Sequence, residues 1–185
     1  GKTEDLYALV DDFGPDGAKH ANVIRTVGPI GSAILDESQP ASVRIGNYSE
    51  QSPVTAMLGT AVYPNINKQT RSSSQEAENG SVEFTITDAS DTILEESPGP
   101  VTIRGGAYQS IYTFENNTTD ATSITRSLIA TDSFRLVRDR VLFKFINGSN
   151  ELVDVYILRP GQDLDEVAPL LNDMGFAGQQ NSESI

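Results

Sequence analysis

The residues of this chain that could do chemistry are mainly carboxylates, and the densest group is the run DDFGPDG at residues 11–17. Clustered Asp oxygens between glycine turns suit Ca²⁺. The run lacks the EF-hand spacing, in which Asp or Asn recurs before a glycine and a Glu follows. The pairs Asp88 with Asp91 and Asp163 with Asp165 could join a site only if folding brings them together. We therefore expect solvated acidic loops, with structural calcium as the alternative.

Asp154 lies in the apolar run VDVYIL, between Val153 and Val155. In a strand its side chain points away from both valines. Acid–base catalysis would require a second carboxylate or a base at a defined distance, and the sequence nominates none. We expect an outward or edge carboxylate bonded to a turn or a basic neighbour, with ligand binding as the alternative. We interpret residues 142–161 as a hairpin of two strands.

His20 is the single histidine, so a Ser-His-Asp triad would have to use it. The chain has no Gly-x-Ser-x-Gly elbow, and the neighbours of His20 are typical of an exposed loop. Gly105-Gly106 lacks both the Lys-Ser/Thr of a phosphate-binding loop and the third glycine of a dinucleotide fingerprint. We predict no catalytic residue, no cofactor and no metal site.

Two groups of side chains are candidates for binding a ligand. A basic cluster along residues 134–147 could bind an acidic glycan or a partner, although neutralising the surplus of carboxylates is the more ordinary role. Aromatic side chains alternate on one face of a second predicted strand, where they form either part of the core or a platform for a sugar. The basic residues are Arg135, Arg138, Arg140 and Lys144, and the aromatic residues are Tyr108, Tyr112 and Phe114.

The composition excludes several classes of function. The chain of 185 residues has 13 basic and 26 acidic residues, a net charge of −13 and no Cys. Nucleic acids and anionic membranes are therefore poor partners, and cysteine chemistry is absent. No window is long and apolar enough for a transmembrane helix, and the N-terminal residues do not form a signal peptide. If the protein is exported, we expect that its signal has been removed.

Hydrophobic residues recur with a period of two, which predicts an all-β fold. In VEFTIT (82–87) three apolar residues face one side, and further strands are predicted at 101–104, 107–115, 123–130 and 134–147. Short strands separated by Gly, Pro, Asn, Asp and Ser clusters are typical of an all-β sandwich or barrel. We expect an immunoglobulin-like antiparallel β-sandwich, because a repeat in the sequence recurs after about the length of one such module. A short helical turn is expected near residues 163–171, where Asp163 and Glu166 resemble a capping box.

An internal repeat divides the chain. VRIGNYS at residue 43 aligns with FKFINGS at residue 143, and PVTAML then aligns with LVDVYI after a gap of one residue. We predict an N-terminal extension over residues 1–40 with NVIRTVG as a candidate strand, a sandwich module over 41–138, and a partial second module over 139–185. Half a sandwich has unpaired strand edges, which would permit self-association through a sheet edge.

The motif VDVYIL, together with Asn147-Gly148-Ser149 and the strand entry Gly105-Gly106-Ala107-Tyr108, resembles the bacterial secreted module called domain of unknown function 4397. The resemblance is strong only over residues 140–165, and the first copy has VTAM where Val-Asp-Val-Tyr would be expected. It implies an exported immunoglobulin-like sandwich, often in tandem and often lipid-anchored at a cell surface. It supplies no catalytic residue.

We therefore expect an exported, non-enzymatic binding module, periplasmic or at the cell surface, whose partner is a protein or glycan of the cell envelope. One alternative is a structural subunit that shares strands with its neighbours, and another is a carboxylate-dependent glycan hydrolase. Five Asn-x-Ser/Thr matches are attributed to chance in turns rich in these residues. They begin at Asn47, Asn79, Asn116, Asn117 and Asn147.

Overall fold

The fold of this chain is all-β, as predicted, in a computed structural model that describes most of its backbone. A single 3-10 turn is the one helical element in the described residues. The backbone is described for residues 6–13, 19–26, 31–34, 37–96, 100–116, 124–132, 142–176 and 179–183, and side chains for 37–95, 100–116, 124–132 and 144–176.

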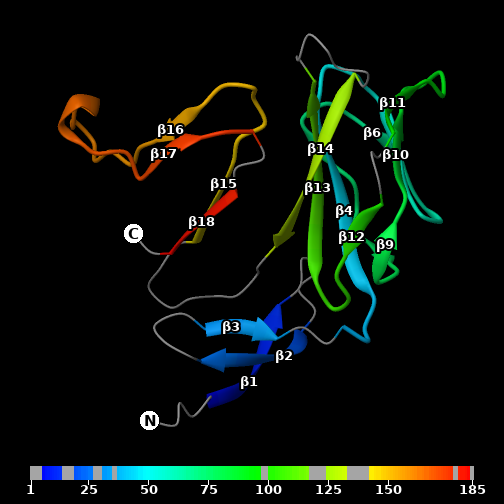
Figure 1. Cartoon of the computed structure of the whole chain (residues 1–185), viewed down its shortest axis with the longest axis horizontal. Helices are drawn as coiled ribbons and strands as arrows, with labels where there is room; N and C mark the ends of the chain where they lie inside the picture. Colours follow the sequence, from blue (N-terminus) through cyan, green and yellow to red (C-terminus); the bar gives the residue numbers. More distant parts are fainter. Residues whose placement is uncertain are drawn as a thin grey trace.

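Residues 41–132 form two packed β-sheets (Figure 1). The first sheet contains β4 (Ala41–Tyr48), β7 (Thr70–Arg71), β8 (Gln75–Ala77), β13 (Tyr108–Glu115) and β14 (Thr125–Asp132). The second contains β5 (Val54–Leu58), β6 (Ala61–Ile66), β10 (Phe84–Thr87) and β11 (Ile93–Glu96). The strand orders are β14-β13-β4-β7, with β8 also on β4, and β11-β10-β5-β6.

The core lies between these two sheets because their strands alternate apolar and polar residues. Val43 and Ile45 of β4 are fully buried, and so is Ile111 of β13. Their partners across the core, including Ala56 and Ile86, come from the second sheet. The opposite face of β4 and β13 points away from this core, since successive side chains of a strand lie on opposite faces.

One strand pairing differs from the prediction of an antiparallel sandwich. β13 runs parallel to β4, with Ile111 opposite Ile45 and Tyr112 opposite Gly46. All other described strand pairs are antiparallel. Alternation of side chains cannot distinguish the two directions, because both place every second residue on one face.

The predicted strand 82–87 is divided in the structure. Val82 ends β9 (Gly80–Val82), which pairs with β12 (Val101–Ile103), whereas Phe84 begins β10, which pairs with β5 and β11. Phe84 and Ile86 are buried on one face, as predicted.

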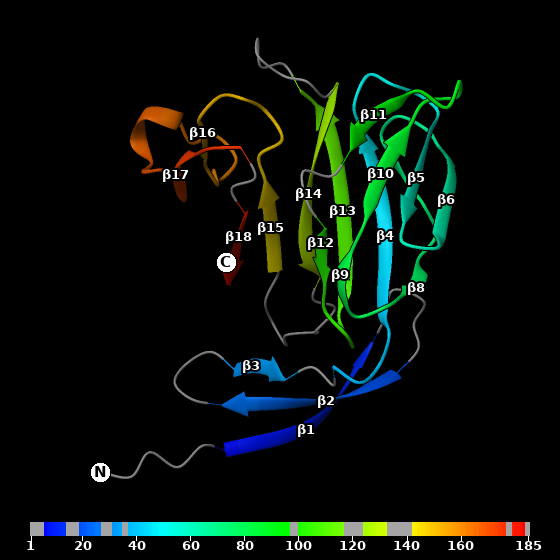
Figure 2. The same ribbon diagram turned by 45° about the vertical axis from the view of Figure 1, so that its right-hand side comes forward.

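The N-terminal segment contains three strands rather than one candidate strand. β1 (Leu6–Phe13), β2 (Lys19–Thr26) and β3 (Gly31–Ile34) form an antiparallel sheet in that order. This sheet lies beyond one end of the two packed sheets (Figures 1 and 2). The segment DLYALVDDF (5–13) is mostly β1.

The C-terminal segment corrects the predicted hairpin over residues 142–161. It contains β15 (Leu142–Ile146), β16 (Val153–Val155), β17 (Leu171–Met174) and β18 (Gln179–Glu183). β15 pairs with β18, and β16 pairs with β17, so β15 and β16 belong to different sheets. The predicted helical turn is the 3-10 element η1 (Leu164–Glu166), but the Asp163 side chain makes no capping hydrogen bond.

The two Asn-x-Ser turns make the same five hydrogen bonds. Asn47 Nδ2 donates to Gln51 O (2.7 Å) and Ile66 O (3.2 Å), and its Oδ1 accepts from the backbone N–H and hydroxyl of Ser49, which also donates to Gln51 O. Asn147 repeats this set with Glu151 O, Met174 O and Ser149. In both turns the buried amide joins the end of one strand to a strand of another sheet.

The strand pairs that follow these turns also match. Val54 is opposite Ile66 and Ala56 opposite Tyr63, with a bulge between them. In the C-terminal segment Val153 is opposite Met174 and Val155 opposite Leu171, again with a bulge. The residues before Ile66 and Met174 both have positive φ, 54° at Asn65 and 51° at Asp173. The turn after β4 and the β5–β6 pair therefore have the same local geometry as the turn after β15 and the β16–β17 pair.

We predict that Asn47→Ala lowers the free energy of unfolding by about 2–4 kcal/mol, because it leaves two carbonyls and the Ser49 hydroxyl without their buried partner.

Asn147→Ala should remove protection from amide hydrogen exchange in β15 to β17 more than in β4 and β13. The measurements are urea unfolding and hydrogen exchange. Asn172→Ala is the control, since its amide contacts only an exposed carboxylate. Equal effects of all three variants would contradict the role of the buried amides.

Candidate binding pocket

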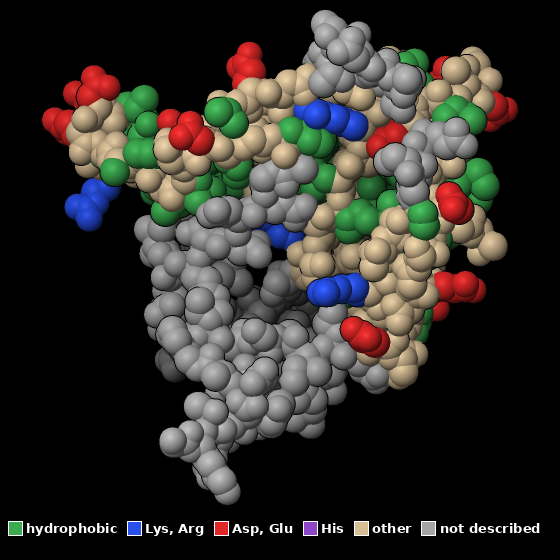
Figure 3. Space-filling view, in the orientation of Figure 1, with side chains coloured by type: hydrophobic (Ala, Val, Ile, Leu, Met, Phe, Trp, Pro, Cys, Tyr) green, Lys and Arg blue, Asp and Glu red, His purple; other side chains and the backbone are tan. Residues whose placement is uncertain are grey.

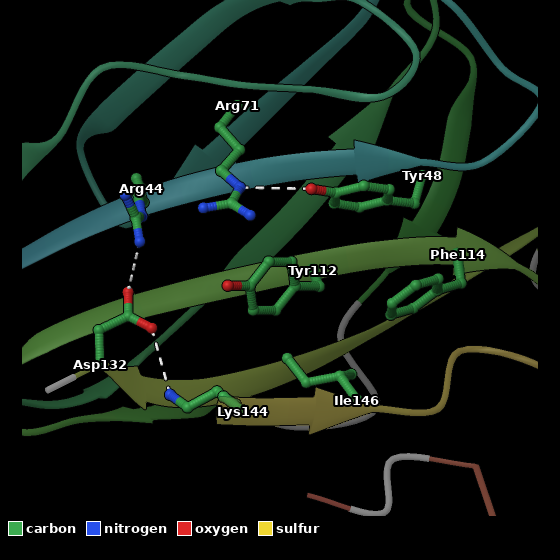
Figure 4. Close-up of a pocket in the computed structure, with 8 residues that line it drawn as sticks. All are labelled: Arg44, Tyr48, Arg71, Tyr112, Phe114, Asp132, Lys144 and Ile146. Atoms are coloured by element: carbon green, nitrogen blue, oxygen red, sulfur yellow. Dashed lines mark hydrogen bonds and ion pairs between the residues drawn. The ribbon is translucent and has the colours of Figure 1, made fainter. Parts of the chain in front are cut away.

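A pocket of about 500 Å³ lies on the face of the first sheet that points away from the core (Figure 4). This volume falls within the range of pockets that hold small ligands. Side chains from five strands line it: Arg44 and Tyr48 from β4, Arg71 from β7, Tyr112 and Phe114 from β13, Asp132 from β14, and Lys144 and Ile146 from β15.

Alternation along β4 and β13 places these side chains together. Arg44, Gly46 and Tyr48 share one face of β4, and Tyr112 lies opposite Gly46 on β13. A Cβ at Gly46 would be 3.0 Å from Tyr48 Cε2 and 3.2 Å from Tyr112 Cδ1, so glycine makes room for the two rings. Between the rings and β15 the outer face has its own small apolar cluster, centred on Tyr112 and Leu128.

One end of the pocket is an ionic group around Asp132. Its Oδ2 accepts from Arg44 Nη2 at 3.0 Å and from the Ser110 hydroxyl, and its Oδ1 accepts from Lys144 Nζ at 3.2 Å. Arg44 Nε also donates to Ser110 Oγ at 2.8 Å. The Asp132 side chain is only 10% exposed, which strengthens its attraction to both cations. Lys144 thereby connects β15 to β14.

The other end of the pocket is aromatic. The Tyr48 ring lies 5.9 Å from Tyr112 and is stacked with Phe114 at 5.8 Å between ring centroids. The Arg71 guanidinium lies 5.7 Å from the Tyr112 ring centroid, and its Nε donates to Tyr48 Oη at 3.3 Å. The hydrogen bond to Tyr48 is the main cause of a raised pKa of Arg71, which remains charged at any physiological pH.

The pocket carries an excess of positive charge. Among the side chains that the structure describes, three cations line it, Arg44, Arg71 and Lys144, against one carboxylate, Asp132; these give a net charge of +2 in a chain of net charge −13. Asp132 is bonded to Arg44 and Lys144, and Arg71 has no ion pair with a carboxylate in the part of the chain described. Figure 4 shows the Arg71 guanidinium beside the Tyr112 ring, between the ionic group around Asp132 and the rings of Tyr48 and Phe114.

The sequence identified part of this pocket. Lys144 of the predicted basic cluster lines it, while Arg135, Arg138 and Arg140 lie outside the described residues. Tyr112 and Phe114 line it too, and Tyr108 does not. The prediction missed five lining residues: Arg44, Tyr48, Arg71, Asp132 and Ile146. The repeat alignment contained a signal for Arg44, because it pairs Arg44 with Lys144, and the two converge on the same carboxylate.

The structure gives the other candidate residues ordinary partners. Asp154 is exposed, and its Oδ1 accepts the backbone N–H of Asp173 at 2.8 Å. Asp88 accepts the N–H groups of Ser90 and Thr92, and these bonds lower the pKa of its carboxyl. Asp163 and Asp165 are exposed beside η1.

The remaining candidates concern metal ions, glycosylation and the membrane. The side chains of DDFGPDG (11–17) and His20 lie outside the described part of the chain. Among the side chains that are described, no three of His, Cys, Asp or Glu are grouped as metal ligands. The amides of Asn47 and Asn147 are buried, and Gly105 packs against the Glu37 backbone. No described helix is of a length and hydropathy that would span a bilayer.

A second buried carboxylate lies at the edge of the two packed sheets. Glu95 of β11 accepts hydrogen bonds from Ser127 N (2.8 Å), Ser127 Oγ (2.7 Å) and Thr125 Oγ1 (3.5 Å) of β14. Burial raises the pKa of Glu95, although these hydrogen bonds and the charge of Arg126 act in the opposite direction. Glu95 thus joins the edges of the two sheets and does not reach the pocket.

The raised pKa of Glu95 predicts a pH dependence of stability. Between the ordinary pKa of 4.5 and its raised pKa in the folded chain, Glu95 keeps a proton when the chain is folded and loses it when the chain unfolds. The free energy of unfolding of the parent therefore falls as the pH rises through this range. The value for the parent minus the value for Glu95→Gln should fall as the pH rises from 4.5, because Gln does not titrate. Urea unfolding from pH 4 to 8 measures it, with the exposed Glu83→Gln as control. A difference that grows with pH would contradict the assignment.

Comparisons with known proteins do not assign this chain to a family. No protein-family model matches the chain, and no curated protein matches its sequence. Among solved structures, the chain is similar to the C-terminal domain of AlgF from P. aeruginosa, with 21% sequence identity and a TM-score of 0.37. The alignment covers 51% of this chain and 99% of that domain. A similarity of this size says nothing about function.

Proposed function

We propose that this chain is an immunoglobulin-like, non-enzymatic binding module of the cell envelope, and that its pocket binds an acidic saccharide. The observation that carries the proposal is the pocket's excess of positive charge beside three aromatic rings, in a chain that is otherwise strongly acidic. Selective attraction of an anion requires a local field opposite to that of the remaining surface. Guanidinium groups also bind carboxylates with two parallel hydrogen bonds.

The aromatic end supports a ring-shaped ligand rather than a bare anion. Sugar rings have apolar C–H faces that pack on aromatic side chains, and Tyr48 and Phe114 are stacked at the pocket. Arg71 lies between the ionic end and the aromatic end of the pocket, over the Tyr112 ring and hydrogen-bonded to Tyr48. A uronate that packs on these rings would direct its carboxylate to Arg71.

The same residues favour binding over hydrolysis. Glycoside hydrolysis uses two carboxylates on either side of the scissile bond. Of the described side chains that line the pocket, Asp132 is the one carboxylate, and it is held in ion pairs with Arg44 and Lys144. The resemblance of residues 140–165 to an exported bacterial module supports the placement at the cell envelope.

The test compares a short oligogalacturonate with the neutral oligosaccharide in which each carboxylate is reduced to CH₂OH. We expect the acidic sugar to bind and the neutral sugar to bind at least about tenfold more weakly, because it lacks the charge-assisted hydrogen bonds. Chemical-shift changes should occur on β4, β7 and β13. Isothermal titration measures the affinity, which should fall as salt is raised.

Arg71→Gln should weaken binding of the acidic sugar by about tenfold or more without unfolding the chain, since Arg71 is exposed. Lys68→Gln is the matched control, because Lys68 is an exposed cation that pairs with Glu50 outside the pocket. Equal binding of the two sugars, or equal binding by parent and Arg71→Gln, would overturn the proposal.

A further inference from the structure

The strand β16 has one open edge in the part of the chain that the structure describes. It pairs with β17 on one side and with no described strand on the other. β5, which has the same local geometry in the sandwich, pairs with β6 on one side and with β10 on the other. In Figures 1 and 2, β16 and β17 lie at the side of the molecule away from β5 and β10.

The segment that contains β16 exposes several large apolar side chains. Leu58 of β5 is 2% exposed in the core of the sandwich, with Phe84 of β10 opposite it. The matching residue after β16 is Ile157, which is 37% exposed. Four further large apolar side chains of this segment are exposed: Leu152, Leu158, Leu164 and Leu170. An unpaired strand continued by an exposed apolar side chain, here Ile157, is typical of a docking surface.

The charge around the edge indicates the chemistry of its partner. Residues 144–176 contain six acidic and two basic side chains, a net charge of −4. Acidic and apolar side chains are interspersed over β16, β17 and η1 (Figure 3). A second copy of this chain would bring the same negative charge to the contact, which disfavours self-pairing. A basic strand would be attracted.

We propose that the open edge of β16 binds a β-strand of a partner protein, in the position that β10 takes beside β5. The strand runs antiparallel to β16 and places apolar side chains at alternate positions opposite Val155 and Ile157, as Ile86 and Phe84 lie opposite Ala56 and Leu58. Lys or Arg residues flank these apolar positions and meet the acidic surface. Main-chain hydrogen bonds supply affinity and the two apolar side chains supply specificity.

The probe is a capped peptide with the sequence of residues 82–88 in which Glu83 and Asp88 are replaced by Lys, VKFTITK. The peptide VKSTSTK, with Phe84→Ser and Ile86→Ser, has the same charge without the apolar pair. The unaltered peptide VEFTITD has the apolar pair with acidic flanks. We expect VKFTITK to bind the full chain at least about tenfold more tightly than either of the others. Fluorescence anisotropy measures the affinity, and amide chemical shifts place the peptide on β16.

Ile157→Ser should abolish binding of VKFTITK, because it removes the apolar contact at the open edge. The matched control is Val62→Ser, which removes an exposed apolar side chain of similar exposure from β6 of the sandwich and should leave binding unchanged. Circular dichroism checks that both variants are folded.

Three results would overturn the proposal. Equal binding of VKFTITK and VKSTSTK would mean that charge alone attracts the peptide. Binding that Ile157→Ser leaves unchanged would place the peptide elsewhere on the chain. A dimer in light scattering that Ile157→Ser dissociates, without peptide binding, would assign the edge to a second copy of this chain.

Discussion

The central constraint in this structure is that β4 lies inside a sheet with one face packed in the core and the other face lining the pocket. Its inward residues, Val43 and Ile45, pack in the core, and its outward residues, Arg44 and Tyr48, line the pocket. A shift of register by one residue would exchange these sets and would place an arginine in the core. The core therefore positions the pocket, and the parallel partner β13 places Tyr112 beside Gly46.

The turn that follows β4 depends on a buried asparagine. A carbonyl at the end of a strand that leaves its sheet needs a donor, since an unpaired buried carbonyl is costly. Asn47 supplies two donors and Ser49 a third, and the C-terminal segment uses Asn147 and Ser149 in the same way. A short polar motif thus sets the path of the chain between sheets in both places.

The C-terminal segment is fastened to the sandwich by a few specific contacts. Phe114 packs edge-on against Phe176 at 6.3 Å, and a Cβ at Gly148 would overlap the Phe114 ring. The guanidinium of Arg126 lies over Phe176, and its Nη2 donates to Asn150. These contacts hold β15 against the outer face of the first sheet, where Lys144 and Ile146 complete the pocket. The pocket consequently depends on the first sheet and on β15 of the C-terminal segment.

Local pattern in the sequence determined the strand character of the chain, its acidic charge, the inward faces of residues 82–87 and the likeness of the two Asn-x-Ser turns. These properties depend on residues that are close together in the sequence. The alternation of apolar and polar residues and the residue types at the turns are therefore enough to predict them. Tertiary structure alone decided that Arg44, Arg71 and Asp132 meet in one pocket, that β13 runs parallel to β4, and that β15 and β16 enter different sheets. Contacts between residues far apart in the chain are set by which strands pair and how sheets pack, and a period of two is compatible with many such arrangements.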